Sequence, residues 1–265
     1  MENWIEDGPV TLTFADGVAK LTLNRPDVAN GMNLEMMQAI HAAAMRCHGD
    51  PRVRVVHLKG EGRHFCAGGD VRDFSSKGEG IGDYLKEVTA WLQVAVGALI
   101  RLDAIVVTEV QGFAAGGGGL GLVCASDIVV AAESAKFMAG ATRVGMAPDA
   151  GSSRILPALV GFRRAMEIML TNRAVSAEEA ERIGLITEVT DDDRLSDRAG
   201  EIVAMIAKGA PLGQSATKRL LWNALEVEIC LPEEARTVAA LSATKDSREG
   251  LAAVMEKRAP VFTGE

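Results

Sequence analysis

Two glycine-rich segments each follow a predicted buried strand and run into a predicted helix. The first, residues 64–70, reads HFCAGGD, and the second, residues 112–121, reads GFAAGGGGLG. Glycine allows positive φ and lets a ligand approach the main chain closely. Helix N-termini also present free N–H groups and the positive end of the helix dipole. Two such amides from two loops predict an oxyanion hole, which stabilises negative charge developing on a carbonyl oxygen.

The second segment also satisfies the pattern G-x-G-x-x-G, over residues 116–121. In the dinucleotide-binding fingerprint, the first glycine closely follows the first strand, and an acidic residue lies about 20 positions further on. Here residues 111–115 separate the strand from the glycines, and the pattern lies more than a hundred residues into the chain. The pattern is therefore weak support for a dinucleotide site. No Gly-Lys-Ser or Gly-Lys-Thr follows, which excludes a P-loop.

The four histidines show no catalytic or metal-binding pattern. His64 adjoins the first glycine segment, and we expect it to face solvent or to hydrogen-bond a nearby backbone group. His41, His48 and His57 lie on predicted helix or strand positions with no partner pattern. No Ser-His-Asp order and no metal-ligand cluster is present.

The elements that position the first segment begin with a hairpin. Residues 9–24 alternate with period two on either side of a turn at 15–17, which is typical of two antiparallel strands. Asn33 then occupies an N-cap position, and the apolar spacing after it predicts a helix over 34–48.

Two further strands deliver the glycine segments. They are predicted over 53–58 and 104–110, with a helix over 82–102 between them. A third short strand is predicted over 127–132, and Phe137 lies on a possible fourth. Strands alternating with helices indicate an α/β fold whose connections cross between short strands.

The C-terminal third is predicted to be helical. Its helical patterns cover 150–160, 161–171, 176–183, 192–208, 212–230, 232–244 and 246–256. Gly209, Ala210 and Pro211 form the most plausible boundary of an appended segment. We therefore expect a core over 1–208 and a helical segment over 209–265.

Composition restricts the partners and the compartment. The formal net charge of -8 argues against a nucleic-acid binder. The longest strongly apolar run, 94–100, is far shorter than the ~18–20 residues that span a bilayer, so no membrane segment is expected. The N-terminus shows no secretory signal. The cysteines are far apart and lack zinc-site spacing, so they are interpreted as buried free thiols of a cytoplasmic protein: Cys47, Cys66, Cys124 and Cys230.

Several motifs together resemble the enoyl-CoA hydratase/isomerase family, also called crotonases. They are the first glycine segment, the second one ending in ASDI at 125–128, and Asn24-Arg25-Pro26 followed by Asn33. The resemblance continues to SREG at 247–250 and KRAPVF at 257–262. It implies a spiral of ββα units with a C-terminal helical trimerisation segment. It also implies binding of acyl-CoA thioesters and stabilisation of their enolates.

The resemblance also assigns site residues by position. The amides of Gly69 and Gly117 would form the oxyanion hole. Asp70 counts among the binding residues, although its position favours holding the first loop or capping the next helix. The other positions that would contact coenzyme A are Arg25, Val28, Ala29, Ala67, Gly69, Lys257 and Arg258. For the three basic residues, an ordinary solvated charge is an equally good interpretation.

Both glutamates that a hydratase of this family uses are missing. The first would fall at Leu120, and the second would fall at Ala141. Neither side chain can transfer a proton, so the two-carboxylate addition of water is put in doubt.

Asp149 is the acidic residue that remains well placed. Its position resembles that of the acid/base in family isomerases, particularly the one of phenylacetate degradation, which also lacks both glutamates. The implied mechanism is a double-bond shift in a 3-enoyl-CoA, in which Asp149 removes a C2 proton and returns it at C4. An apolar wall would raise the pKa of Asp149, and we expect it to come from Leu120, Trp91, Met138 and Met146. The competing interpretation is a helix cap before residues 150–153.

The resulting hypothesis is an enoyl-CoA isomerase of acyl-CoA metabolism. The alternatives are other enolate reactions, namely thioester hydrolysis, decarboxylation and slow hydration, and a non-catalytic acyl-CoA-binding protein. No prosthetic group or metal is expected, because coenzyme A enters as part of the substrate. The expected assembly is a homotrimer or a dimer of trimers.

Overall fold

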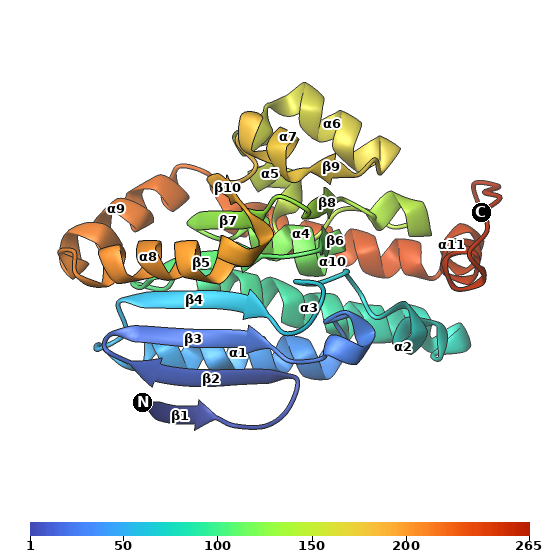
Figure 1. Cartoon of the computed structure of the whole chain (residues 1–265). Helices are drawn as coiled ribbons and strands as arrows, with labels where there is room; N and C mark the ends of the chain where they lie inside the picture. The colour runs from blue at the N-terminus through green and yellow to red at the C-terminus, as the bar shows by residue number, and fades with distance from the viewer.

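Seven strands form the main sheet in the computed structural model, which describes residues 1–265 (Figure 1). In sheet order they are β1 (Glu2–Ile5), β2 (Val10–Ala15), β3 (Val18–Leu23), β4 (Val55–Gly60), β5 (Ile105–Val110), β7 (Ile128–Ala132) and β10 (Glu188–Thr190). Strands β1 to β3 are antiparallel, which confirms the predicted hairpin, and pairing from β3 to β10 is parallel. Parallel strands end at the same edge of a sheet, so the segments after β4 and β5 emerge as neighbours.

A second, smaller sheet receives both glycine segments. It contains β6 (Phe113–Ala115), β8 (Lys136–Met138) and β9 (Val175–Ser176). Isolated bridges join Cys66 to Ala114 and Gly69 to Met32. The first glycine segment is thereby held beside β6, which leads directly into the second. Strand β6 is too short to give a periodic sequence signal, and it was not predicted.

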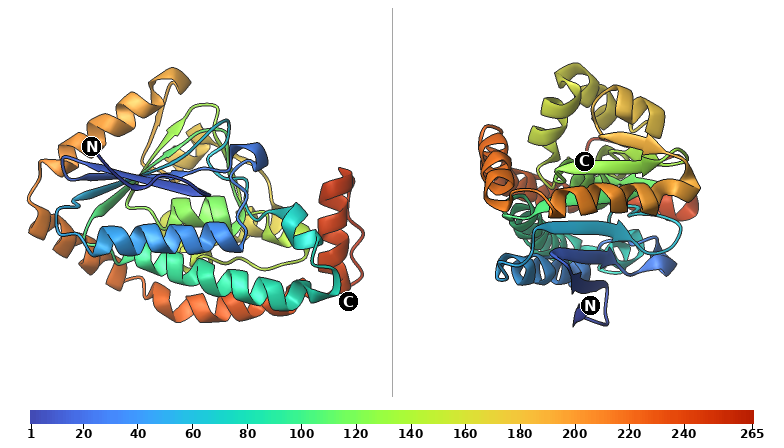
Figure 2. Two further views of the ribbon diagram at one scale, coloured as in Figure 1. Left: turned by 90° about the horizontal axis from the view of Figure 1, so that it is seen from below. Right: turned by 60° about the vertical axis from the view of Figure 1, so that its left-hand side comes forward.

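Three long helices lie side by side along one face of the main sheet, as the left view of Figure 2 shows. They are α1 (Leu34–His48), α3 (Ile81–Ile100) and α10 (Val227–Ser242). The side chain of Asn33 accepts a hydrogen bond from the Met36 amide at 3.0 Å, which confirms the predicted N-cap of α1. Helix α8 (Leu195–Ala207) contacts β4, β5 and β7.

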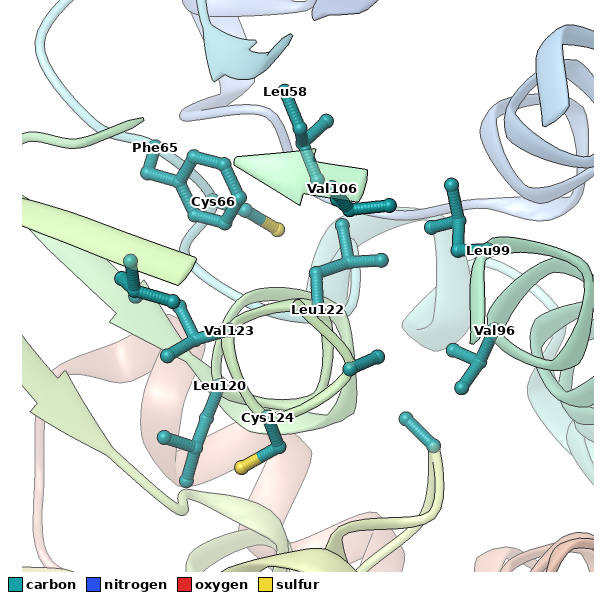
Figure 3. Close-up of a cluster of buried hydrophobic side chains, with 14 of the residues drawn as sticks. Leu58, Phe65, Cys66, Val96, Leu99, Val106, Leu120, Leu122, Val123 and Cys124 are labelled. Carbon is teal, nitrogen blue, oxygen red and sulfur yellow. The ribbon is translucent and has the colours of Figure 1, made fainter. Parts of the chain in front are cut away.

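Helix α4 (Gly116–Cys124) lies inside the hydrophobic core and carries the second glycine segment. Figure 3 shows it surrounded by Leu58 and Val106 of the sheet and by Val96 and Leu99 of α3. Because the first turns of α4 have almost no side chains, neighbouring segments can approach its backbone closely.

The remaining helices are short or lie toward the C-terminus. They are η1 (Pro26–Val28), α2 (Val71–Ser75), η2 (Gly78–Gly80), η3 (Ala141–Val144), α5 (Ser152–Val160), α6 (Phe162–Thr171), α7 (Ala177–Arg182), η4 (Asp192–Arg194), α9 (Pro211–Asn223) and α11 (Lys245–Glu256). No helix has the length and apolar character needed to cross a membrane.

The predicted break between helices at Pro232 is wrong. The chain turns instead after α9, where Glu226 has a φ of 49°, and α10 begins at Val227 and continues through Pro232. A proline inside a helix removes one backbone hydrogen bond. Here the buried face of α10, which contains Leu231 and Val238, keeps the helix intact through its packing.

Helix α9 is fastened to the rest of the chain by a buried cation. Lys218 Nζ donates to the carbonyl oxygens of Leu99 at 3.1 Å and Ala104 at 3.0 Å. It also lies 2.8 Å from Asp127 Oδ2, while Trp222 Nε1 donates to the other oxygen of Asp127 at 2.6 Å. The predicted boundary at residues 209–211 coincides with the connection between α8 and α9.

All four cysteines are free thiols, as expected from their spacing. Cys47, Cys66 and Cys124 are buried, and Cys230 is only partly buried.

Candidate active site

The two glycine segments line one cavity of about 250 Å³. Gly68 and Gly69 come from the first segment, and Gly116 and Gly117 come from the second. The Gly69 amide donates to no backbone acceptor. Gly117 is the second residue of α4, in the turn where helix amides lack intrahelical partners. The cavity therefore has two backbone amides available for a ligand oxygen.

Asp149 lines the same cavity and lies directly against Gly117. A Cβ atom added to Gly117 would lie 1.6 Å from Asp149 Oδ1, so the carboxylate occupies the space of the missing side chain. No other residue donates a hydrogen bond to this carboxylate. Asp149 is the only carboxylate among the residues that line the cavity. A single proton-transfer group thus faces the space beside the two amides.

Burial, followed by the negative charge of Glu234, raises the pKa of Asp149 to about 7. Loss of hydration disfavours the charged form of a carboxyl group, and a nearby like charge acts in the same direction. A pKa near the working pH suits a group that must both accept and return a proton.

The capping interpretation of Asp149 is wrong. The N-cap residue of α5 is Gly151, and no side chain of that segment caps the helix. Instead, the carboxylate of Glu234 on α10 accepts hydrogen bonds from the Gly151 amide at 2.6 Å and the Ser153 amide at 2.9 Å. Since Glu234 accepts the hydrogen bonds of the amides at this helix end, the Asp149 side chain is not needed there and faces the cavity.

Asp70 and Arg25 brace the first glycine segment. Asp70 is the N-cap of α2 and accepts a hydrogen bond from the Asp73 amide at 3.1 Å. Its other oxygen lies 2.9 Å from the Arg25 guanidinium, which also donates to the Gly31 carbonyl. Both side chains are therefore engaged within the protein.

The segment with Val28 and Ala29 runs beside the first glycine segment. The Ala67 amide donates to the Ala29 carbonyl at 3.0 Å, and Ala67 lines the cavity. Ala29 has a φ of 52°, which turns the chain back toward residues 66–69.

The two basic residues near the C-terminus differ in their surroundings. Arg258 forms ion pairs with Glu249 and Glu256. Lys257 is the exposed C-cap of α11 and forms no ion pair. Helix α11 also contributes Leu251 and Val254 to the cavity wall.

The apolar wall differs in part from the expectation. Met138 and Met146 line the cavity, and Ala141 does as well. Leu120 does not, because it is 2% exposed and lies in the core beside Cys124 (Figure 3). Trp91 does not either, because it packs edge-on against His41 at a centroid distance of 5.6 Å.

The face of α3 that meets the cavity explains the error for Trp91. Leu85, Val88 and Leu92 line the cavity and recur at helical spacing. Trp91 lies one residue away from that stripe, so its ring points elsewhere.

Two histidines, His57 and His64, form polar contacts. His64 Nδ1 accepts a hydrogen bond from the Phe113 amide at 3.2 Å, in agreement with the expected backbone partner. His57, which shows no partner pattern in the sequence, has a partner in the folded chain, because its Nε2 lies 3.0 Å from Glu109 Oε2 across neighbouring strands. Sequence periodicity does not reveal which residues face each other in a parallel pair.

Glu234 was not predicted as a functional residue. It is 83 positions from Gly151 and belongs to the C-terminal helical segment, which the family resemblance associates with trimerisation. One signal was available. Glu234 falls on the buried stripe of α10, between Leu231 and Val238, and a carboxylate on such a stripe needs a polar partner.

Comparison with known proteins extends over nearly the whole chain. A family model described as enoyl-CoA hydratase/isomerase matches residues 13–265. A Rhodobacter capsulatus protein named "Probable enoyl-CoA hydratase" is 38% identical over 255 residues, covering 95% of this chain and 96% of that protein. The 1,2-epoxyphenylacetyl-CoA isomerase of Escherichia coli is 35% identical over 254 residues, covering 94% and 96%.

Solved structures give the same result. An enoyl-CoA hydratase from Mycobacterium avium subsp. paratuberculosis superposes with a TM-score of 0.88 at 31% identity, covering 97% of this chain and 99% of that chain. An enoyl-CoA hydratase/isomerase from Pseudoalteromonas atlantica gives a TM-score of 0.85 at 33% identity, covering 97% and 100%.

Proposed function

The chain belongs to the enoyl-CoA hydratase/isomerase family, with its crotonase fold, and we propose that it is an enoyl-CoA isomerase that shifts the double bond of a 3-enoyl-CoA. The observation that carries this proposal is the single carboxylate, Asp149, in a cavity lined by Gly69 and Gly117.

In the proposed reaction, the amides of Gly69 and Gly117 donate hydrogen bonds to the thioester carbonyl oxygen. Asp149 accepts a proton from C2, and the electrons of that C–H bond form the enolate. The amides stabilise the oxyanion, an interaction whose loss typically costs ~2.7–4 kcal/mol of barrier. The carbonyl then re-forms, the double bond moves to C2–C3, and Asp149 returns the proton at C4. No water is consumed, so one carboxyl group is sufficient.

The missing hydratase glutamates support this choice. Leu120 lies in the core, and Ala141 lines the cavity without a proton-transfer group. Addition of water needs one group to activate the water and one to deliver a proton to carbon. A shift within the substrate needs only one group that can act in both directions, and the pKa of Asp149 at about 7 suits both.

Coenzyme A is proposed to bind as part of the substrate, with no prosthetic group. The segment with Val28 and Ala29 adjoins Ala67 at the cavity, and it would contact the coenzyme A moiety. Lys257 is the better candidate for a phosphate, because Arg25 and Arg258 are already paired with carboxylates. Asp70 would act by holding the first loop.

A panel of CoA thioesters with product identification tests the proposal. We expect 3-enoyl-CoA to gain the absorbance of a conjugated thioester while its mass stays the same. If the main product is 3-hydroxyacyl-CoA, a free acid or a decarboxylated compound, the chain catalyses another reaction of the family and the isomerase proposal fails. Binding without turnover of any panel member would instead indicate an acyl-CoA-binding protein.

Hydration is the second candidate, because similar proteins carry hydratase names. It would need water placed by backbone groups, with Asp149 as the only carboxyl group in the cavity. In the same panel it would appear as a mass gain of one water on 2-enoyl-CoA.

We further propose that the helices after residue 209 join copies of this chain into a trimer or a dimer of trimers. Helix α9 exposes three leucines, Leu212, Leu220 and Leu221, which contribute little to the core of a single copy. Large exposed apolar groups gathered on one element are typical of association surfaces.

A further inference from the structure

Glu234 is a buried carboxylate that no step of the proposed reaction uses. It lies on α10, is 7% exposed, and forms no ion pair. Its two oxygens instead accept the hydrogen bonds from the amides of Gly151 and Ser153. Those amides begin two residues after Asp149, so Glu234 holds the chain that carries the proposed base.

The turn that Glu234 holds has an unusual backbone. Ala150 has a φ of 57° and Gly151 a φ of 75°, so two consecutive residues are left-handed. A non-glycine residue keeps this conformation only when its surroundings fix it. The turn therefore needs contacts on more than one side.

The opposite side of the turn rests on α4. A Cβ atom added to Gly117 would overlap the Asp149 carboxylate, and one added to Gly121 would lie 2.4 Å from the Ala150 Cβ. Gly117 and Gly121 are one helical turn apart and thus form one bare face. The turn is held between this glycine face of α4 and the Glu234 carboxylate of α10.

Among the charged groups around Asp149, Glu234 has the largest effect on its pKa. Burial keeps the nearby thiols neutral, raising the pKa of Cys124 to about 12 and that of Cys230 to about 11. Arg143 of η3 lines the cavity, and Arg154 of α5 points to the Leu225 carbonyl and Glu226. The residues of α3 at the cavity carry no charge.

The negative charge of Glu234 acts on Asp149. Burial raises the pKa of Glu234, and the hydrogen bonds from the Gly151 and Ser153 amides oppose that rise. Asp149 receives no such bonds from its neighbours, so the amides favour a shared proton on Asp149 rather than on Glu234. An ionised Glu234 in turn holds that proton on Asp149 more strongly.

We propose that Glu234 is a positioning residue, an inference that rests on the proposed function. Glu234 fixes Asp149 against Gly117, and its buried charge sets the pH range in which Asp149 accepts the C2 proton. Glu234 does not line the cavity, so it acts on Asp149 through the turn at residues 149–151 and through its charge.

Glu234→Gln tests the electrostatic part, because glutamine has nearly the same shape without the charge. We expect the acid limb of kcat/KM for 3-enoyl-CoA isomerisation to move down by about one pH unit. The matched control is Glu233→Gln, an exposed carboxylate next to it on α10, which should leave the limb in place. Glu234→Asp keeps the charge but shortens the side chain, so we expect a lower kcat with the acid limb unchanged.

A titration without turnover gives a second readout. Carboxyl ¹³C NMR, with Asp149 assigned through Asp149→Asn, should show coupled titration of Asp149 and Glu234 in the unaltered protein. This measurement uses the unaltered protein, so it can be made even if Glu234→Gln does not fold. If Asp149→Asn abolishes isomerisation but the Asp149 titration is independent of Glu234, the inference is overturned and the proposed function stands. If Asp149→Asn leaves isomerisation intact, the proposed function itself fails, whatever the titration shows.

Discussion

At the scale of single residues, the proposed chemistry depends on the position of the Asp149 carboxylate and on its surroundings. Its carboxylate lies against Gly117 and takes no part in capping α5, because Glu234 accepts the amide hydrogen bonds there. Burial then raises the pKa of Asp149 to about 7. An ordinary surface aspartate would be a much weaker base at the same position.

The pH dependence of the reaction follows from this pKa. Only ionised Asp149 can accept the C2 proton, and its raised pKa means that the ionised form appears as pH rises through about 7. We expect kcat/KM to fall about tenfold per pH unit below that value and to level off above it. A stopped assay from pH 5 to 9 measures the profile. A flat profile across pH 5–7 would contradict the assignment of Asp149 as the base.

The sequence predicted that the two glycine segments and Asp149 belong to one site, because their order along the chain matches the family motif. All of them line the cavity. The sequence did not predict Glu234 or the pairing of His57 with Glu109, since both depend on elements that meet only in the folded chain. It also placed Trp91 in the cavity wall, although a shift of one residue on α3 turns the ring toward His41.

At the scale of elements, the bare face of α4 is what lets the loop of Asp149 reach the amides of the proposed oxyanion hole. Helix formation disfavours glycine by about 1 kcal/mol per residue relative to alanine. A run of four glycines therefore makes α4 a poor helix by itself, and its enclosure in the core compensates for this.

Gly117→Ala tests the role of that face. The added Cβ would overlap Asp149 Oδ1, so the carboxylate must move. We expect kcat to fall by at least about 100-fold. Gly200→Ala is the matched control, because a Cβ on that glycine of α8 meets nothing within 4 Å. Equal activity of the two variants would contradict the geometry proposed for the site.

A second element-level feature is the buried Glu109 cluster, which joins β4, β5 and α8. Glu109 lies 3.0 Å from His57 and 3.2 Å from Lys59, and it accepts a hydrogen bond from Ser196 at 3.1 Å. Burial alone would raise the pKa of Glu109, but His57 and Lys59 outweigh it and lower the pKa to about 2. The cluster therefore stabilises the fold at pH values above the ordinary pKa of a glutamate, and this contribution is lost as pH falls toward 2.

Glu109→Ala should lower the free energy of unfolding by about 3–5 kcal/mol at pH 7, because the Lys59 ammonium and the buried His57 ring lose the carboxylate that both contact. Urea unfolding at one fixed protein concentration measures the change. Glu233→Ala removes an exposed carboxylate and should cost less than about 1 kcal/mol. If both variants lose the same small amount, Glu109 is not a stabilising link between these elements.

Element boundaries were predictable where a cap or a glycine turn marks them, as at Asn33 and residues 15–17. They were not predictable where packing overrides local propensity. Pro232 inside α10 is the clearest case, because its effect on the helix is smaller than that of the buried face around it.

At the scale of the whole molecule, the C-terminal helices belong to the site as well as to the exterior. Val238 of α10 and both Leu251 and Val254 of α11 close the cavity, while Figure 1 shows α9 at the far side of the molecule from α11. The same segment that would join copies of the chain thus also completes the cavity.

Replacement of Leu220 and Leu221 by glutamate tests the proposed assembly. These side chains are 71% and 68% exposed, so the fold of one copy should tolerate the change. We expect sedimentation equilibrium to show a trimer or hexamer for the unaltered chain and a shift toward monomer for the double variant. Leu170→Glu, at an exposed position on α6, serves as the control. A monomeric unaltered chain would contradict the proposal directly.

The most direct test of the central claim is the rate at which Asp149→Asn converts 3-enoyl-CoA to 2-enoyl-CoA, relative to the unaltered protein and to Asp83→Asn on the exposed surface of α3. Asparagine keeps the shape of the side chain but cannot accept the C2 proton. The account predicts a loss of about 10²–10⁴-fold in kcat for Asp149→Asn and full activity for Asp83→Asn. Conversion by Asp149→Asn within about tenfold of the unaltered rate would contradict it.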